Sequence, residues 1–130
     1  MRLLLDTHAF LWWVTESPRL SALARSAIAD TEAQVRVSVV TIWEIAIKKR
    51  LDRLVYPDDF AAYTRGQFAD NDFAVLDVTL DHVFGVYDLA QLADHRDPFD
   101  RILAAQARTE GLALVSADAN FDRYGIERVW

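Results

Sequence analysis

The stretch that decides the fold is Arg2-Leu3-Leu4-Leu5-Asp6, a short apolar run that ends abruptly in an acid. A run of this length next to charged residues is typical of a buried β-strand. Further short segments rich in Val, Ile and Leu follow at intervals along the chain. We predict strands at residues 2–5, 35–39, 73–76, 112–116 and 126–129.

Helices are predicted between these strands, because apolar residues recur there at spacings of three and four. Thr79 can cap one helix, Asp97-Pro98 is a typical helix start, and Gly111 stands where a helix commonly ends. The predicted helices cover residues 7–14, 20–30, 40–51, 57–69, 79–91 and 97–110, and residues 118–125 form a loop or a short helix. Strands that alternate with helices predict an α/β fold with a parallel sheet and helices on both faces.

The length and composition limit the possible classes of protein. We expect residues 1–130 to form a single domain, and the 52% hydrophobic content is typical of a globular protein. The chain has no cysteine, which excludes disulfides, thiolate zinc sites, iron–sulfur clusters and a cysteine nucleophile. No apolar run approaches the roughly 18 residues of a membrane span. Asp6 comes too early for a signal peptide, so we expect a cytoplasmic protein without membrane association.

The charge balance is acidic. Asp and Glu number 20 against 14 Lys and Arg, which gives a net charge of −6. Taken alone, this charge argues against a nucleic-acid binder, whose usual signature is a basic patch. Fifteen of the acids are aspartates. Asp forms helices and strands poorly, so most should lie in caps and turns, and those that do not are candidate functional residues.

Several acids follow predicted strands directly or lie near the start of a predicted helix. The carboxyl ends of parallel strands meet at one edge of a sheet, where functional groups gather. Two unit charges about 5 Å apart repel by roughly 3 kcal/mol at an effective dielectric of about 20. A cluster of carboxylates therefore favours a bound cation, and oxygen ligands favour Mg²⁺ or Mn²⁺. The candidate metal ligands are Asp6, Glu44, Asp97, Asp100 and Asp118.

Most of these acids also have a structural interpretation. Asp97 is a good N-cap ahead of Pro98, and Asp100 favours the helix dipole. Glu44 can pair with Lys48 four residues on. The three histidines, His8, His82 and His95, show no ligand spacing and are expected to be structural.

Four stretches, taken together and in this order, resemble the PIN domain, and more narrowly the VapC-type toxins of bacterial toxin–antitoxin pairs. They are Leu4-Leu5-Asp6-Thr7-His8, Ser38-Val39-Val40-Thr41-Ile42-Trp43-Glu44-Ile45, Asp97-Pro98-Phe99-Asp100-Arg101-Ile102-Leu103-Ala104-Ala105-Gln106-Ala107 and Leu114-Val115-Ser116-Ala117-Asp118. The resemblance covers nearly the whole chain and implies a three-layer α/β/α sandwich and a metal-dependent ribonuclease.

The resemblance maps the family's acidic quartet onto Asp6, Glu44, Asp100 and Asp118, which would be both the catalytic residues and the metal ligands. Asp97 is an additional acid. We prefer Asp100 to Asp97 because the small pair Ala104-Ala105 follows it and suits packing against the sheet. Where the family often has Thr two residues before its fourth acid, this chain has Ser116, which keeps the hydroxyl.

The chemistry implied is hydrolysis of RNA phosphodiester bonds with Mg²⁺ or Mn²⁺ as the cofactor. The resemblance also implies an antitoxin protein that covers the site, and a toxin homodimer. Basic residues near the acids are candidate contacts to the RNA backbone, or simply solvated helix ends. They are Lys48, Lys49, Arg50, Arg53, Arg96 and Arg101. Exposed apolar groups such as Phe10, Trp12 and Trp13 would suit the interface with the antitoxin. The two tryptophans could also stack on an RNA base, although core or interface packing is the stronger expectation for them.

Other classes explain less of the sequence. A phosphoacceptor receiver domain would use Asp77 but needs a lysine near a late strand, and both lysines lie early in the chain. A calcium loop beginning at Asp118 lacks the expected glycine, which is Arg123, and the expected glutamate, which is Val129. A non-catalytic protein-binding module, a metal-dependent phosphatase and a DNA nuclease remain as alternatives.

Overall fold

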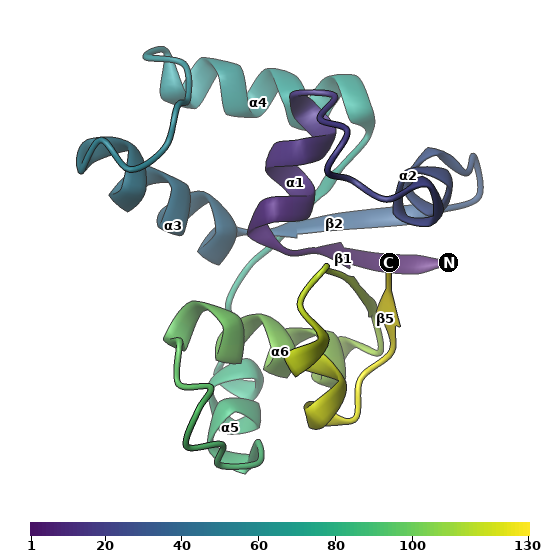
Figure 1. Ribbon diagram of the computed structural model, residues 1–130, viewed down its shortest axis with the longest axis vertical. Helices are drawn as coiled ribbons and strands as arrows, with labels where there is room; N and C mark the ends of the chain where they lie inside the picture. The colour runs from purple at the N-terminus through teal and green to yellow at the C-terminus, as the bar shows by residue number, and fades with distance from the viewer.

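The computed structural model describes residues 1–130 and contains one five-stranded sheet in which all neighbouring strands run parallel (Figure 1). The strand order is β3-β2-β1-β4-β5, with β1 at the centre. The strands are β1 (Arg2–Leu5), β2 (Gln34–Ser38), β3 (Ala74–Leu76), β4 (Ala113–Val115) and β5 (Arg128–Val129). The parallel sheet predicted from the alternation of strands and helices is therefore confirmed.

The register brings the ends of three strands level. Leu5 of β1 pairs with Val37 of β2 on one side and with Val115 of β4 on the other. The residues that follow these strands therefore meet at one edge of the sheet. This edge, which we call the carboxyl edge, is where the acids are expected.

Helices cover both faces of the sheet, so the fold is an α/β/α sandwich (Figure 1). Helices α1 to α4 lie on one face, and α5, α6 and a 3₁₀ helix lie on the other. Their bounds are α1 (Thr7–Val14), α2 (Ala22–Ala29), α3 (Val39–Arg50), α4 (Phe60–Asn71), α5 (Leu80–Asp88), α6 (Pro98–Glu110) and η1 (Ala119–Tyr124). None of the helices combines the length and the apolar character that crossing a membrane requires.

The two faces of β1 supply two separate cores, because successive side chains of a strand point to opposite faces. Leu3 and Leu5 pack with α1 to α4, whereas Leu4 packs with α6 and η1. All three leucines are fully buried. On the second face, the small residues Ala104 and Ala105 are also fully buried, which agrees with the packing expected for this pair.

The predicted element boundaries differ from the structure mainly at two helices. The helix expected from residue 57 begins at Phe60, and Asp59 is its N-cap without a side-chain hydrogen bond. The helix expected to reach residue 91 ends at Asp88, and residues 89–97 form a loop ahead of α6. Thr79 caps α5 and Gly111 ends α6 in the left-handed conformation, as the sequence indicates.

Candidate active site

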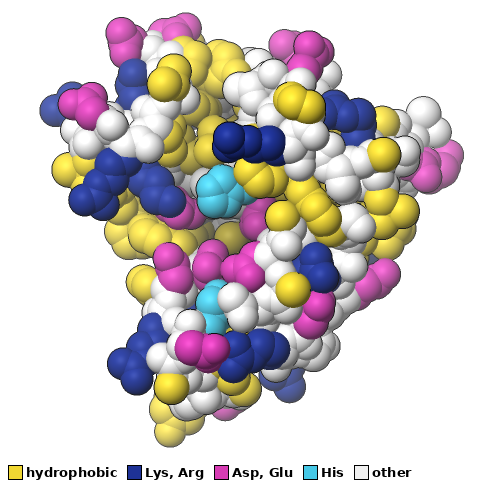
Figure 2. All heavy atoms as spheres, in the orientation of Figure 1, with side chains coloured by type: hydrophobic (Ala, Val, Ile, Leu, Met, Phe, Trp, Pro, Cys, Tyr) yellow, Lys and Arg dark blue, Asp and Glu magenta, His cyan; other side chains and the backbone are white.

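Acidic side chains gather at the carboxyl edge, in the hollow between the two helical layers (Figure 2). In Figure 2, histidine side chains lie next to them and basic side chains surround the hollow. The acids come from segments that are distant in sequence: the end of β1, the helix α3, the start of α6 and the segment after β4.

Asp6 lies directly after β1 and is buried. Its Oδ1 accepts a 2.8 Å hydrogen bond from the backbone N–H of Ala9, so it caps α1. Burial raises the pKa of this carboxyl, and the negative charge of Glu44 raises it further, while the Ser116 hydroxyl and His8 oppose the rise. The sequence suggested no local role for Asp6, and the structure gives it one as the cap of α1.

Glu44 lies in the second turn of α3 and is also buried. Its Oε1 accepts a 2.6 Å hydrogen bond from the Thr7 hydroxyl, and its Oε2 lies 2.7 Å from the Lys48 ammonium. The pairing with Lys48 that the spacing allows is therefore present. It involves a buried carboxylate and not a surface one, so it does not remove Glu44 from the edge.

Asp97 and Asp100 have different positions at the start of α6. Oδ1 of Asp97 accepts hydrogen bonds from the backbone N–H groups of Phe99 and Asp100, so its predicted capping role is confirmed. Asp100 points toward the other acids. Burial raises the pKa of Asp100 to about 6; repulsion from Asp97 adds to this, and attraction to His95 opposes it. Glu44 and Asp118 also raise the pKa of Asp100, which places all these charges in one electrostatic neighbourhood.

Asp118 follows β4 and caps η1, since its Oδ1 accepts a 2.9 Å hydrogen bond from the backbone N–H of Asn120. Its own backbone N–H donates to the Ser116 hydroxyl oxygen at 3.0 Å. Its Oδ2 stays on the side of the acids, 3.9 Å from Nε2 of His95. The carboxyl therefore has one oxygen for the fold and one for a ligand.

His95 is the member of the cluster that the sequence analysis missed. It lies in the loop before α6, is buried, and has Nε2 3.3 Å from Oδ2 of Asp100. No spacing pattern marks it; its only signal is its place two residues before Asp97. His82 does have the structural role expected of it, since it closes the cap of α5 with Thr79 and binds Glu110.

These residues could hold a divalent cation. Ligand atoms of His95, Asp100 and Asp118 all lie within 4.8 Å of one another. Asp97 is outside this group, although its charge, like that of Glu44, raises the pKa of Asp100. Asp6 is linked to the group through Glu44, whose charge raises the pKa of Asp6. A cation would offset the repulsion that raises the pKa of Asp100.

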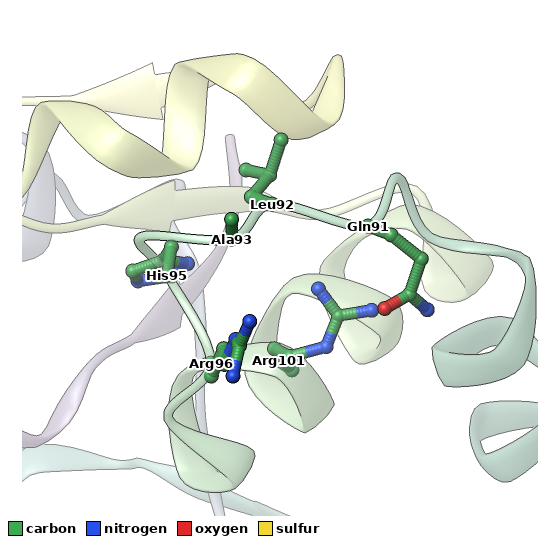
Figure 3. A pocket seen from close by; sticks show the side chains of 6 residues that line it. All are labelled: Gln91, Leu92, Ala93, His95, Arg96 and Arg101. Carbon is green, nitrogen blue, oxygen red and sulfur yellow. The ribbon is translucent and has the colours of Figure 1, made fainter.

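The basic residues near the site are in two different situations. Lys48 is paired with Glu44, and Lys49 is 2.7 Å from Asp58, so neither ammonium is free. Arg50, the last residue of the same helix, and Arg53, three residues beyond it, are exposed. On the other side, Arg96 and Arg101 line a hollow of about 460 Å³ next to His95 (Figure 3), although Arg101 also donates hydrogen bonds to the Ala90 carbonyl and the Tyr124 hydroxyl.

The aromatic residues suggested for an interface are not the exposed ones. Phe10 is fully buried, so that suggestion was wrong, because the side chain lies on the inner face of α1. Trp12 and Trp13 are half-buried against the core, as the packing interpretation expects. Instead, Trp43 of α3 is 61% exposed and borders an apolar groove of about 550 Å³. The groove is lined by Val39, Val40, Trp43, Val78, Pro98, Phe99 and Ile102.

Comparison with solved structures places the fold among toxin–antitoxin proteins. VapBC-1 from nontypeable Haemophilus influenzae matches with a TM-score of 0.72 and 16% sequence identity, covering 98% of this chain and 96% of that chain. DNA-bound VapBC from Salmonella typhimurium has a TM-score of 0.70 and 21% identity, covering 98% and 96%. A toxin–antitoxin complex from Klebsiella pneumoniae has a TM-score of 0.60 and 20% identity, covering 89% and 86%.

At these identities the solved structures establish a shared fold. A sequence search of curated proteins gives no match. The family model of the PIN domain, however, matches residues 3–127, which is almost the whole chain. The match includes three of the four residues of the central strand β1 and every acid at the carboxyl edge. The chain therefore belongs to the PIN domain family.

Proposed function

We propose that the protein is a metal-dependent endoribonuclease and the toxin of a toxin–antitoxin pair, acting in the cytoplasm. Residues 1–130 would form its single nuclease domain. The observation that carries the proposal is the meeting of Asp6, Glu44, Asp100 and Asp118 at the carboxyl edge of a PIN-family sheet. Such a concentration of carboxylates is costly without a cation.

In this proposal Asp6, Glu44, Asp100 and Asp118 hold Mg²⁺ or Mn²⁺, directly or through its waters. A bound divalent cation would polarise a phosphoryl oxygen and lower the pKa of a water near neutral pH. The chain's own residues fix the carboxylates beforehand. Thr7 holds Glu44, and the caps of α1 and η1 hold Asp6 and Asp118.

Two exposed apolar surfaces are candidate binding sites for the antitoxin and for a second copy of the chain. The apolar groove is lined by Trp43 and Phe99, the sequence neighbours of Glu44 and Asp100, and an antitoxin segment would bind there. Helix α5 carries a second apolar stripe, spaced as one helical face and at least half exposed. The stripe comprises Leu80, Val83, Phe84 and Tyr87, and we assign it to the homodimer.

The test is cleavage of single-stranded RNA by purified protein in the presence of Mg²⁺ or Mn²⁺. We expect activity that EDTA abolishes and that Asp100→Asn reduces by several orders of magnitude. Asp97→Asn is the comparison variant, since asparagine keeps the cap and Asp97 is not among the three residues whose ligand atoms lie within 4.8 Å of one another. Because the charge of Asp97 raises the pKa of Asp100, we expect a small change in activity and not its loss.

Activity that survives in Asp100→Asn but disappears in Asp97→Asn would mean that Asp97, and not Asp100, is the third acid of the catalytic quartet. Activity that survives in both variants and in EDTA would contradict a metal-dependent nuclease at this edge. Thermal melting with and without Mn²⁺ separates the metal site from the reaction, because a ligand that binds only the folded chain raises its melting temperature.

A further inference from the structure

His95 has a nitrogen atom that the fold leaves without a partner. Its side chain is 93% buried, with the ring packed against Phe121 and Tyr124. Nε2 is itself inaccessible to solvent and has no hydrogen-bond partner. Buried polar atoms are nearly always paired, so an unpaired one needs an explanation.

The unpaired nitrogen faces the acids. It lies 3.3 Å from Oδ2 of Asp100 and 3.9 Å from Oδ2 of Asp118, without hydrogen-bond geometry to either. Ligands about 2.1 Å from one ion are separated by roughly 3 to 4.2 Å. The distances from Nε2 to the two carboxylate oxygens are therefore those of ligands to a common ion, and ligand atoms of all three residues lie within 4.8 Å of one another.

The other ring nitrogen of His95, Nδ1, decides whether Nε2 carries a hydrogen or a free lone pair. Nδ1 is 2.5 Å from the Tyr124 hydroxyl oxygen, which also receives an N–H from Arg101. The Tyr124 hydroxyl in turn donates toward the His95 backbone carbonyl at 3.5 Å. In the tautomer in which Nδ1–H donates to the Tyr124 oxygen, Nε2 has a free lone pair, and this is the tautomer that binds a metal through Nε2. A second hydrogen-bonding partner of this kind commonly orients a metal-bound histidine.

We propose that Nε2 of His95 is a direct ligand of the metal at the carboxyl edge, together with Asp100 and Asp118, and that Tyr124 is its positioning residue. This inference rests on the proposed metal site. It changes the donor set from oxygen alone to oxygen with one imidazole nitrogen. Imidazole suits transition metals better than Mg²⁺, so the site prefers Mn²⁺ to Mg²⁺.

The experiment is pulsed electron paramagnetic resonance of Mn²⁺ bound to the full chain. A directly bound imidazole gives a ¹⁴N coupling, which ¹⁵N-histidine labelling of the wild type must convert to a ¹⁵N coupling. This measurement needs no substitution, so it holds even if a His95 variant fails to fold. We expect the coupling to be lost in His95→Gln and kept in His8→Gln, the control at an exposed histidine.

Metal affinities give a second result. Tyr124→Phe should weaken Mn²⁺ binding about tenfold, as loss of an outer partner does, and His95→Gln should weaken it at least as much. The loss for Mg²⁺ should be smaller in both variants. Bound Mn²⁺ without a histidine coupling, or equal losses for both ions, would overturn the role of His95 alone. Wild-type protein that binds neither ion would overturn the proposed metal site itself.

Discussion

The hydroxyl of Thr7 donates a 2.6 Å hydrogen bond to Oε1 of Glu44, and this bond joins α1 to α3 at the carboxyl edge. Both residues are buried. Thr7→Val keeps the shape but leaves one oxygen of a buried carboxylate without its donor. We expect the free energy of unfolding to fall by about 1.5–3 kcal/mol, the usual value for a hydrogen bond to a charged group. Urea denaturation measures the change.

Thr7→Ser is the control for this prediction, because it keeps the hydroxyl and loses one methyl group, at a cost of about 1 kcal/mol. If Thr7→Val and Thr7→Ser are equally stable, the hydrogen bond does not hold Glu44. The same pair of variants should differ in Mn²⁺ affinity, with the valine variant the weaker binder.

The raised pKa of Asp100 predicts how stability depends on pH in metal-free buffer. Asp100 has a pKa of about 6 in the folded chain and an ordinary value of 3.8 when unfolded. Between these values the folded chain binds more protons, so the free energy of unfolding falls as pH rises from about 4 to about 6. In Asp100→Asn this fall should shrink by about 1 kcal/mol, a reduced figure because the side chain is partly exposed.

A control of opposite sign is available at Asp122. Its pKa is lowered by the hydrogen bond from Arg128, so it stabilises the fold above pH 4 and loses this effect in acid. Asp122→Asn should therefore leave the fall between pH 4.5 and pH 7 essentially unchanged and alter the pH dependence only below about pH 4. Urea titrations at pH 4.5 and 7 measure the free energy of unfolding of both variants. If this free energy changes equally with pH in wild type and in Asp100→Asn, the pKa of Asp100 is not raised in the folded chain.

RNA binding should depend on arginines more than on lysines. Lys48 and Lys49 are already paired with acids, whereas Arg50 and Arg53 are exposed without such partners. Each phosphate contact on a single strand contributes about 0.7 to the slope of log affinity against log salt. In an Asp100→Asn background that leaves RNA intact, replacing both arginines by alanine should make the slope shallower by about 1.4.

Arg108→Ala is the comparison for the arginine pair. Arg108 is exposed in the last turn of α6, at the end of the helix farthest from Asp100. Its loss should leave the salt slope unchanged. If Arg108→Ala lowers the salt slope equally, the arginines attract RNA non-specifically, and Arg50 and Arg53 do not form a defined RNA-binding path beside the acids.

The apolar stripe on α5 predicts the oligomeric state. Phe84 is 56% exposed at the centre of the stripe. Phe84→Glu would bury a charge in the assigned interface, so we expect a monomer at concentrations where the wild type is a dimer. Sedimentation velocity measures the masses. Leu23→Glu on α2, where Leu23 is 60% exposed, should remain dimeric; a dimer of Phe84→Glu would remove α5 from the interface.

Local patterns predicted the elements well and their arrangement less completely. The strands and the parallel sheet follow from short apolar runs between helical segments. The order β3-β2-β1-β4-β5 depends on pairings between distant segments, which no local pattern encodes. The start of α4 was predicted too early because Pro57 looks like a helix start. In the structure Tyr56 is instead drawn into the core, where its hydroxyl pairs with Thr64.

The candidate site was predictable where helix geometry decides it. Asp100 shares its face of α6 with Ala104, four residues on and fully buried, which turns it toward the sheet edge, whereas Asp97 is used by the cap. His95 was not predictable in this way. Its position depends on Tyr124, which is 29 residues away, and on a loop with no periodic pattern.

Asp6 and Asp118 each use one carboxylate oxygen to hold the backbone of the following helix. Asparagine offers the same oxygen and also caps helices well, but it has no charge. A single-base change from an aspartate to an asparagine codon therefore removes one negative charge from the carboxyl edge and keeps the helix cap. Asparagine variants at these two positions should therefore stay folded while losing their contribution to a bound cation.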